Sequence, residues 1–437
     1  MTFRTSLIGE HFQLRKGLSY KGQNLVDESE IGLLTIDAFI PGGGYKRGSE
    51  KPYDGEYKTE CVADPDDVLL AMTEQQEGLL ASPLKVPEDL GGKSELVYSL
   101  DVAKLIPTSN EVLPEFIYNF LRIPINRQRA AYGDTGTTVQ RLPFEVIYEQ
   151  KIPIPSLAEQ SRINLFISTL DRRIQLTIAK SETLNGIAQS IYRSWFIDFD
   201  PVLNKMNGIE PIGMNKSLAE LFPDSMMDSE LGAIPTGWQV GAVSQICTKV
   251  LNGSTPLRSN SEFWSRSDIA WYKSGELTDG FLFSPKESIS EIALERSNVK
   301  MLPKGSVLMA IYAAPTVGRL GILNHDSTFN QACTGMMPRP EFGMPFLFLV
   351  LKNRRAWFNS FAIGAAQQNI SKAVVEQCPL LIAPNEVHAA FDSIVSPIFQ
   401  EISSLSEQRT KLEQIRDALL PQLISGEIRL PEELLVS

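Results

Sequence analysis

The chain has 437 residues, of which 43% are hydrophobic and 21% charged, and its formal net charge is −11 at pH 7. This length and composition are typical of two to three globular domains with hydrophobic cores of their own. No stretch approaches the ~18 uninterrupted apolar residues of a membrane helix, so no membrane contact is expected. The acidic balance argues against a protein whose whole surface binds nucleic acid.

Charge is distributed unevenly along the chain. Residues 60–95 contain nine acidic and two basic residues, whereas residues 352–372 contain four basic residues and no acidic one. Affinity for phosphate depends on such local patches rather than on the total charge. The acidic net charge therefore does not exclude a nucleic-acid partner.

The cysteines and the N-terminus indicate the compartment. The four cysteines lie far apart without C-x-x-C spacing, which is typical of reduced, buried cysteines. The N-terminus has no charged region followed by an apolar run, so we expect no signal peptide. Together these features predict a cytoplasmic protein.

Residues 1–155 are predicted to form a first globular domain. Short β-rich runs alternate with turn clusters such as the Pro-Gly-Gly-Gly sequence at 41–44, and one helix is expected to begin at Pro114. This mixture is typical of an α/β or α+β domain.

A long helix is predicted over residues 156–199. The Ile-Pro-Ile-Pro sequence at 152–155 gives a stiff extended lead-in, Ser156 is the expected N-cap, and Glu159 stands three residues later in capping-box position. At ~1.5 Å per residue, some 40 residues of helix reach about 60 Å.

The second half of the chain follows the same plan. Residues 200–236 are rich in Pro, Gly, Met and acidic residues and are predicted to be a linker. A second α/β domain is expected at 237–383, a second long helix at 384–428, and a tail at 429–437.

The two long helices repeat one another. Their apolar residues alternate at three- and four-residue intervals, as in a coiled coil, and the constant shift that carries Ile163 onto Phe391 superimposes most of them. The same shift carries Gly136 and Leu142 onto Gly364 and Ile370. The chain is therefore predicted to be an internal repeat of a globular domain followed by a long helix. The expected helix-pairing residues are Ile163, Ile167, Leu170, Ile174, Leu184, Ile191, Phe391, Val395, Ile398, Ile402, Leu412 and Leu419.

Each helix would expose its apolar stripe unless something covered it. The two helices most simply cover each other, and the 200–236 linker is long enough to favour an antiparallel pair with pseudo-two-fold symmetry. Polar residues in the stripe, among them Arg416, are expected to fix the register or to face a further partner. The alternative is that each helix folds back on its own domain.

Catalytic and metal sites are not predicted in this chain. The three histidines, His11, His325 and His388, have no metal-ligand spacing. Gly92-Lys93-Ser94 lacks the first glycine of a phosphate-binding loop, and the Asn/Asp-Pro-Pro-Tyr/Phe motif of amino-methyltransferases is absent. The chain is expected to be non-catalytic by itself, without a metal or cofactor.

Basic and amide side chains instead gather near two glycine-led polar loops, which follow equivalent positions of the repeat. Arginine binds phosphate or guanine edges, and Gln or Asn binds adenine edges. The candidate DNA-binding residues of the first domain are Arg122, Arg127, Arg129, Thr137, Thr138, Gln140 and Arg141. Those of the second are Ser254, Thr255, Arg258, Arg319, Lys352, Arg354, Arg355, Gln367, Gln368, Asn369 and Lys372.

Several segments match a known family. They are the sequence from Ile152 to Gln160, the sequence from Ser194 to Val202, GAIPTGW from Gly232, the loop from Gly253 to Pro256, the run from Gly305 to Leu323, Gln331-Ala332-Cys333, and the loop from Gln368 to Ser371. Over essentially its whole length the chain resembles the specificity subunit of type I restriction–modification systems. It departs from that pattern where the second helix opens with Pro384-Asn385-Glu386-Val387-His388 instead of an L-x-E-Q form.

The resemblance implies two target-recognition domains, each of which reads one half of a bipartite, asymmetric site in double-stranded DNA, with helices that set the gap. It also implies two modification subunits, which bring S-adenosylmethionine and methylate adenine at N6, and two restriction subunits, which use ATP and Mg²⁺. The alternative from the residues alone is a coiled-coil scaffold that bridges protein partners without reading DNA.

Overall fold

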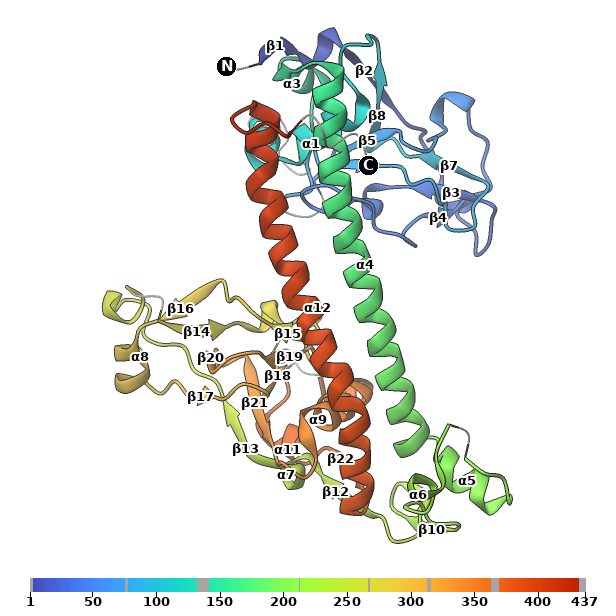
Figure 1. Cartoon of the computed structure of the whole chain (residues 1–437), viewed down its shortest axis with the longest axis vertical. Coiled ribbons are helices and arrows are strands. Elements are labelled where there is room, and N and C mark those ends of the chain that lie inside the picture. The colour runs from blue at the N-terminus through green and yellow to red at the C-terminus, as the bar shows by residue number, and fades with distance from the viewer. Residues whose placement is uncertain are drawn as a thin grey trace. The chain divides into compact units, whose positions relative to one another are not determined.

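The computed structural model describes residues 3–74, 78–131, 141–211, 213–265, 268–312, 316–362 and 369–431, with side chains omitted at 128–131 and 362. The chain forms two compact units (Figure 1). Unit 1 comprises Met1–Gln175 and Lys411–Ser437, and unit 2 comprises Leu176–Thr410. Each unit contains a strand-rich head and parts of two long helices. No helix in the described ranges combines the length and the apolarity that crossing a membrane requires.

The head of unit 1 is built on two small sheets. One has the strand order β2-β8-β5-β6 and the other β4-β3-β7, with β3 and β7 parallel, while β1 pairs with β9. The strands are β1 Arg4–Leu7, β2 Phe12–Lys16, β3 Ile31–Leu34, β4 Lys51–Pro52, β5 Val68–Ala71, β6 Pro83–Lys85, β7 Glu95–Tyr98, β8 Val102–Pro107 and β9 Lys151–Ile154. The helices are α1 Pro114–Arg122, α2 Pro124–Ala131 and α3 Phe144–Tyr148.

The head of unit 2 repeats this topology with one further strand at the end of each sheet, β15 and β17. Its sheets have the orders β13-β21-β18-β19-β15 and β16-β14-β20-β17, with β14 and β20 parallel, while β12 pairs with β22. The strands are β12 Gln239–Ala242, β13 Cys247–Asn252, β14 Ile269–Tyr272, β15 Gly280–Leu282, β16 Glu287–Ile289, β17 Met301–Leu302, β18 Val307–Ala310, β19 Leu320–Leu323, β20 Ser327–Phe329, β21 Cys333–Pro338 and β22 Pro379–Ile382. The helices are α7 Val243–Ile246, α8 Glu291–Arg296, α9 Gly343–Asn353, α10 Arg355–Ala362 and α11 Lys372–Glu376.

The two long helices, α4 Leu157–Phe196 and α12 Asn385–Ser425, lie where the heptad pattern predicts them. The Ser156 hydroxyl caps α4 by accepting the Glu159 N–H at 3.3 Å. Neither helix belongs to one unit only, because each unit takes the first part of one helix and the last part of the other.

The two helices pack against each other in opposite directions within each unit. In unit 1, Ile163 of α4 shares a hydrophobic core with Leu423 of α12. In unit 2, the rings of Trp195 of α4 and Phe391 of α12 lie 5.8 Å apart. The start of α4 therefore meets the end of α12, and the end of α4 meets the start of α12, as the red and green helices show in Figure 1. The predicted antiparallel pairing is confirmed.

Each pair of helix segments also completes the core of a head. The stripe is wider than the heptad pattern alone indicates, because Tyr192, Phe196, Phe399 and Leu420 are buried as well. Burial differs along the stripe. Ile163, Ile167, Ile174, Phe391, Val395 and Ile402 are buried, and Leu170, Leu184, Ile191, Ile398, Leu412 and Leu419 are half-buried.

The predicted linker is anchored in unit 2. It contains α5 Asp200–Met206, α6 Lys216–Ala219, and a hairpin of β10 Met226–Ser229 and β11 Gly232–Pro235. Phe222 and Ile234 are buried in the same hydrophobic core as Trp195 and Trp238. These aromatic contacts hold the segment against the core of unit 2, which its composition alone did not indicate.

The opening of the second helix differs from that of the first in one hydrogen bond. The shift that aligns the two long helices carries Gln160 onto His388 and Pro155 onto Ala383. The Gln160 amide donates to the Pro155 carbonyl at 3.0 Å, whereas Nε2 of His388 accepts the Ala383 N–H at 3.1 Å. Pro155 has no N–H, so the first helix cannot form the contact that Ala383 makes with His388 in the second.

Candidate nucleic-acid interface

One edge of the larger sheet in unit 2 joins three loops through backbone hydrogen bonds. The Ile370 N–H donates to Ile311 at 2.9 Å, and the Ile311 N–H donates to Ala332 at 2.9 Å. Beside them, the Gly253 N–H donates to Cys333 at 3.0 Å, and the Ser254 N–H donates to Phe329 at 3.0 Å. This loop edge therefore brings together two groups of predicted residues that lie far apart in the sequence, those of the loop after β13 and those at the end of the polar loop before α11.

The same ladder is present in unit 1. The Leu142 N–H donates to Met72 at 2.9 Å, and the Met72 N–H donates to Asp101 at 2.9 Å. The Gly17 N–H donates to Val102 at 3.2 Å, and the Leu18 N–H donates to Tyr98 at 2.9 Å. Both heads thus hold the same three loops at the same sheet edge.

A glycine is required at the inner corner of each loop edge. A Cβ atom on Gly17 would overlap the carbonyl oxygens of Tyr98 and Ser99, and one on Gly253 would overlap those of Phe329 and Asn330. The loop after β2, which begins at Gly17, was missed in the sequence. The shift that aligns the long helices carries Gly17 onto Gln245 instead of Gly253, so the repeat pattern does not reveal this loop.

Two tryptophans hold the loop after β13 in unit 2. The Trp271 indole N–H donates to the Ser254 carbonyl at 3.0 Å, and the Trp264 indole N–H donates to the Leu257 carbonyl at 3.3 Å. The Arg258 guanidinium lies 3.8 Å from the centroid of the Trp264 ring and pairs with Glu287. The loop is thereby held in one conformation, with the Leu257 side chain exposed.

The remaining polar contacts of this loop reach the turn after β20. The Thr255 hydroxyl donates to Oε1 of Gln331, whose side chain is exposed. Gln331 is not among the DNA-binding residues that the sequence predicts.

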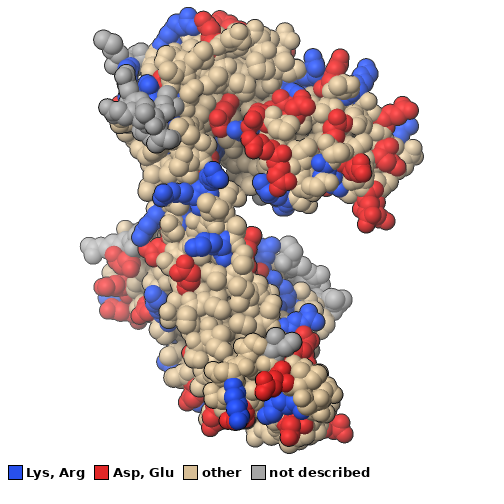
Figure 2. Space-filling view, turned by 45° about the vertical axis from the view of Figure 1, so that its right-hand side comes forward, with Lys and Arg blue, Asp and Glu red and all other residues tan. Residues whose placement is uncertain are grey.

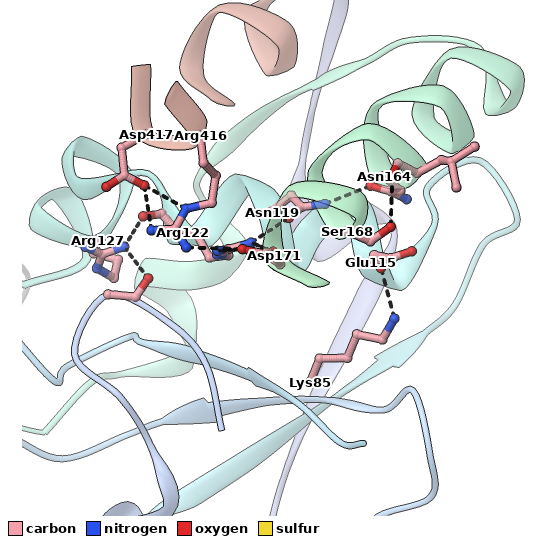
Figure 3. A network of polar contacts seen from close by, with 12 residues as sticks. Lys85, Glu115, Asn119, Arg122, Arg127, Asn164, Ser168, Asp171, Arg416 and Asp417 are labelled. Atoms are coloured by element: carbon pink, nitrogen blue, oxygen red, sulfur yellow. Dashed lines mark hydrogen bonds and ion pairs between the residues drawn. The ribbon is translucent and has the colours of Figure 1, made fainter. Parts of the chain in front are cut away.

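In unit 1 the predicted residue Arg122 is buried rather than exposed. Its guanidinium forms two hydrogen bonds with the Asp171 carboxylate of α4, at 2.6 and 2.8 Å (Figure 3). Arg416 of α12 donates to the same carboxylate at 3.1 Å. Asp171 therefore links α1, α4 and α12 within unit 1, and Arg416, a polar residue of the helix stripe, pairs with a residue of the opposite helix.

The neighbouring residue Arg127 faces the head. Its Nη1 donates to the Gly42 carbonyl at 3.1 Å and to the Leu121 carbonyl at 3.2 Å. Arg127 thus fastens the glycine-rich turn at 41–44 to the end of α1, and its contact with DNA stays a prediction. Figure 3 shows Arg122 and Arg127 side by side at this point.

In unit 2, Arg355 has the corresponding place. Its Nε donates to the Gly318 carbonyl at 2.9 Å, and its Nη1 donates to the Asp279 carboxylate at 2.9 Å. Burial by itself raises the pKa of Asp279, but hydrogen bonds from Arg355 and the Leu320 N–H bring that pKa below its usual value.

The other predicted cations of unit 2 are placed differently. Lys372 pairs with Glu376 at 3.2 Å, and Lys352 is half-buried over the Phe348 ring, where burial lowers its pKa. Among the described residues, the guanidinium groups of Arg319 and Arg354 form no hydrogen bond or ion pair, and their contact with phosphate stays a prediction.

Part of the prediction lies outside the described residues, namely Thr137, Thr138, Gln140, Gln367, Gln368 and the side chain of Arg129. The ends of both polar loops are described. Arg141 is exposed and forms a β-bridge with Thr73, and Asn369 is exposed beside Ile370.

The surface charge agrees with the acidic composition. On the face shown in Figure 2, acidic and basic side chains are interspersed over the described residues, without one continuous basic area. Among those residues, no cluster of three or more His, Cys, Asp or Glu side chains could hold a metal ion.

Known proteins resemble the chain in sequence and in fold. Residues 91–186 and 235–414 match the family model of the type I restriction modification DNA specificity domain. The HindI type I restriction enzyme specificity subunit of Haemophilus influenzae is 27% identical over 370 residues, which cover 74% of this chain and 79% of that protein. The MjaIX specificity subunit of Methanocaldococcus jannaschii is 24% identical over 348 residues, covering 78% and 74%.

A solved structure supports the fold. The S subunit of a type I restriction–modification system from M. genitalium has a TM-score of 0.58 with 16% sequence identity, over 97% of this chain and 96% of that chain. At this identity the likeness concerns the fold alone.

Proposed function

Because the chain belongs to the family of type I restriction modification DNA specificity domains, we propose that its two loop edges each read one half of a bipartite, asymmetric DNA site. The observation that supports this most is the repeated backbone ladder, which holds the same three loops at the same sheet edge in both heads. This shared backbone arrangement of ladder and loops, here called the frame, carries different side chains in the two heads, which suits two different half-sites.

The two frames carry different chemistry. The loop of unit 2 presents Thr255 and Arg258, whereas the corresponding positions of unit 1 are Ser19 and Gly22. Base edges are distinguished by the hydrogen-bond donors, acceptors and apolar groups that meet them in the groove. An asymmetric site follows from this difference, and the lengths of α4 and α12 would set the gap that is not read.

Catalysis belongs, in this proposal, to partner subunits. Two modification subunits would dock on the long helices and methylate adenine at N6 with S-adenosylmethionine, and two restriction subunits would use ATP and Mg²⁺. Partners that surround the DNA would also supply positive charge that this acidic chain lacks. The assembly would act in the cytoplasm, where the DNA lies.

The test is to produce the chain with its modification subunit and map adenine methylation across the host genome. We expect methylation confined to one motif with two specified halves and an unspecified gap. A control lacking this chain should show no methylation at that motif. Methylation without sequence preference, or none at all with a folded complex, would contradict the proposal and favour a scaffold that does not read DNA.

A further inference from the structure

We propose that two positions of the shared frame determine the base preference of each head: Thr255 and Gln331 in unit 2, and Ser19 and Leu100 in unit 1. The inference rests on the proposed function, since it names the residues that would read DNA there. Gln331, Ser19 and Leu100 are not among the residues that the sequence predicts to bind DNA.

The frame fixes these positions in the same way in both heads. Ser19 and Thr255 each lie two residues after the glycine that packs on backbone carbonyls, Gly17 and Gly253. The residue after each glycine, Leu18 or Ser254, donates its N–H to the carbonyl of Tyr98 or Phe329, respectively. Leu100 and Gln331 each lie two residues after that carbonyl. The backbone is therefore shared between the heads, and only the side chains differ.

In unit 2 the pair is polar and oriented. The Thr255 hydroxyl donates to Oε1 of Gln331, and no other side chain in the described ranges occupies the second lone pair of that oxygen or the N–H groups of the amide. A glutamine amide can accept from N6 of adenine and donate to N7 at the same time. The hydroxyl thus holds an exposed amide in a defined orientation for a base edge.

The surroundings of the pair keep it in place. Indole N–H groups of Trp271 and Trp264 bind the loop carbonyls on either side of Thr255. Rigid support of this kind lowers the conformational entropy that a side chain loses when it binds its target. The apolar side chain of Leu257, exposed by 66%, projects from the same loop.

In unit 1 the equivalent pair has a different character. Leu100 stands at the position of Gln331 and is 45% exposed, and Ser19 is exposed as well. An exposed leucine can make an apolar contact with the methyl group of thymine. It cannot form the two hydrogen bonds by which a glutamine amide binds adenine. The two heads would therefore prefer different bases at equivalent places in their half-sites.

The experiment uses the full chain assembled with its modification subunits. Gln331→Leu gives unit 2 the residue of unit 1, and Thr255→Val removes the orienting hydroxyl while keeping the shape of the side chain. The matched control is Gln239→Leu, which changes an exposed glutamine on β12, a strand of another sheet. Methylation kinetics are measured on DNA libraries in which each position of the motif is varied.

We expect Gln331→Leu to reduce the preference at one position of one half-site by about tenfold or more, the range of a lost bidentate contact. Thr255→Val should weaken the same position by a smaller factor, and the other half-site and the control should be unchanged. If both variants kept the full preference at every position, the inference would be wrong while the proposed function stood. If the wild-type complex showed no motif, the proposed function itself would fail.

Discussion

Arg127 and Arg355, which occupy equivalent positions of the internal repeat, each donate a guanidinium hydrogen bond to the carbonyl of a glycine in the left-handed region. The partners are Gly42, with φ of +92°, and Gly318, with φ of +81°. The repeated arginine therefore fastens a turn in each head, whatever further contact it makes with DNA.

Arg355→Ala should destabilise unit 2 by about 1–2 kcal/mol, because it leaves the half-buried Asp279 carboxylate without its cation and the Gly318 carbonyl without its donor. Arg355→Lys should restore this only in part, since one ammonium group cannot reproduce the fork of the guanidinium. Thermal melting of the two variants measures the effect, with Arg354→Ala as the control for a charge that forms no ion pair in the described residues. The DNA affinity of the assembled complex should also fall in Arg355→Ala. An unaltered melting temperature would show that this contact does not support the head.

Asp171→Asn should be more costly, by about 3 kcal/mol, because the Arg122 side chain is only 7% exposed and would keep its charge without a counter-ion. The matched control is Asp198→Asn, which removes an exposed ion pair with Arg193 and should cost far less, since water solvates both partners. Urea unfolding of both variants compares the two losses. Equal losses would mean that Asp171 does not join the head to the helices of unit 1.

The long helices could be predicted closely from the sequence, because a heptad stripe and an N-cap at Ser156 are local signals. The shift that aligns these helices also carries α3 onto α11 and β9 onto β22. By contrast, the burial of Arg122 depends on Asp171, which lies 49 residues away on another helix. A pattern of spacing does not report such a partner.

The loop edge could be predicted only in part. The loop at Gly253 carries polar residues that indicate a binding role. Its counterpart at Gly17 is followed by Leu18 and Ser19, and the shift that aligns the long helices does not superimpose Gly17 on Gly253. What the two loops share is backbone, namely a glycine that packs on carbonyl groups. This packing of the glycine on carbonyl groups forms only when the strands have paired, so a sequence pattern does not reveal it.

Gly17→Ala should destabilise unit 1 by about 2 kcal/mol or more, since the added methyl group would overlap two backbone carbonyls that cannot move without breaking the ladder. Gly22→Ala, in the same loop, has open space around its Cβ position and serves as the control. The melting temperature should fall for Gly17→Ala alone, and methylation of the first half-site should fall with it. A tolerant Gly17→Ala variant would rule out the shared frame in this head.

His388 should make the stability of the chain depend on pH in a defined window. Burial among the rings of Phe196, Phe342 and Phe346 lowers the pKa of His388 from 6.5 to about 4. Above pH 6.5 the residue is neutral in both states. Below it the unfolded chain takes up a proton first, so stability falls by about 3 kcal/mol as the pH drops from 6.5 to about 4.

His388→Gln should remove this component, because glutamine can still accept the Ala383 N–H and does not titrate. His325→Gln, which changes a half-buried histidine elsewhere in unit 2, is the control and should leave the slope in place. Unfolding free energies between pH 7 and pH 4 compare the three proteins. Parallel curves for wild type and His388→Gln would contradict the assignment.

Separate reading by the two heads is tested most directly by exchange of one head. Residues 1–155 are replaced by the corresponding segment of another family member with a different site, and adenine methylation is mapped genome-wide in the presence of the modification subunit. We predict a motif in which one half changes to that of the donor, while the other half and the gap are kept. A motif in which both halves changed, or neither did, would contradict the account.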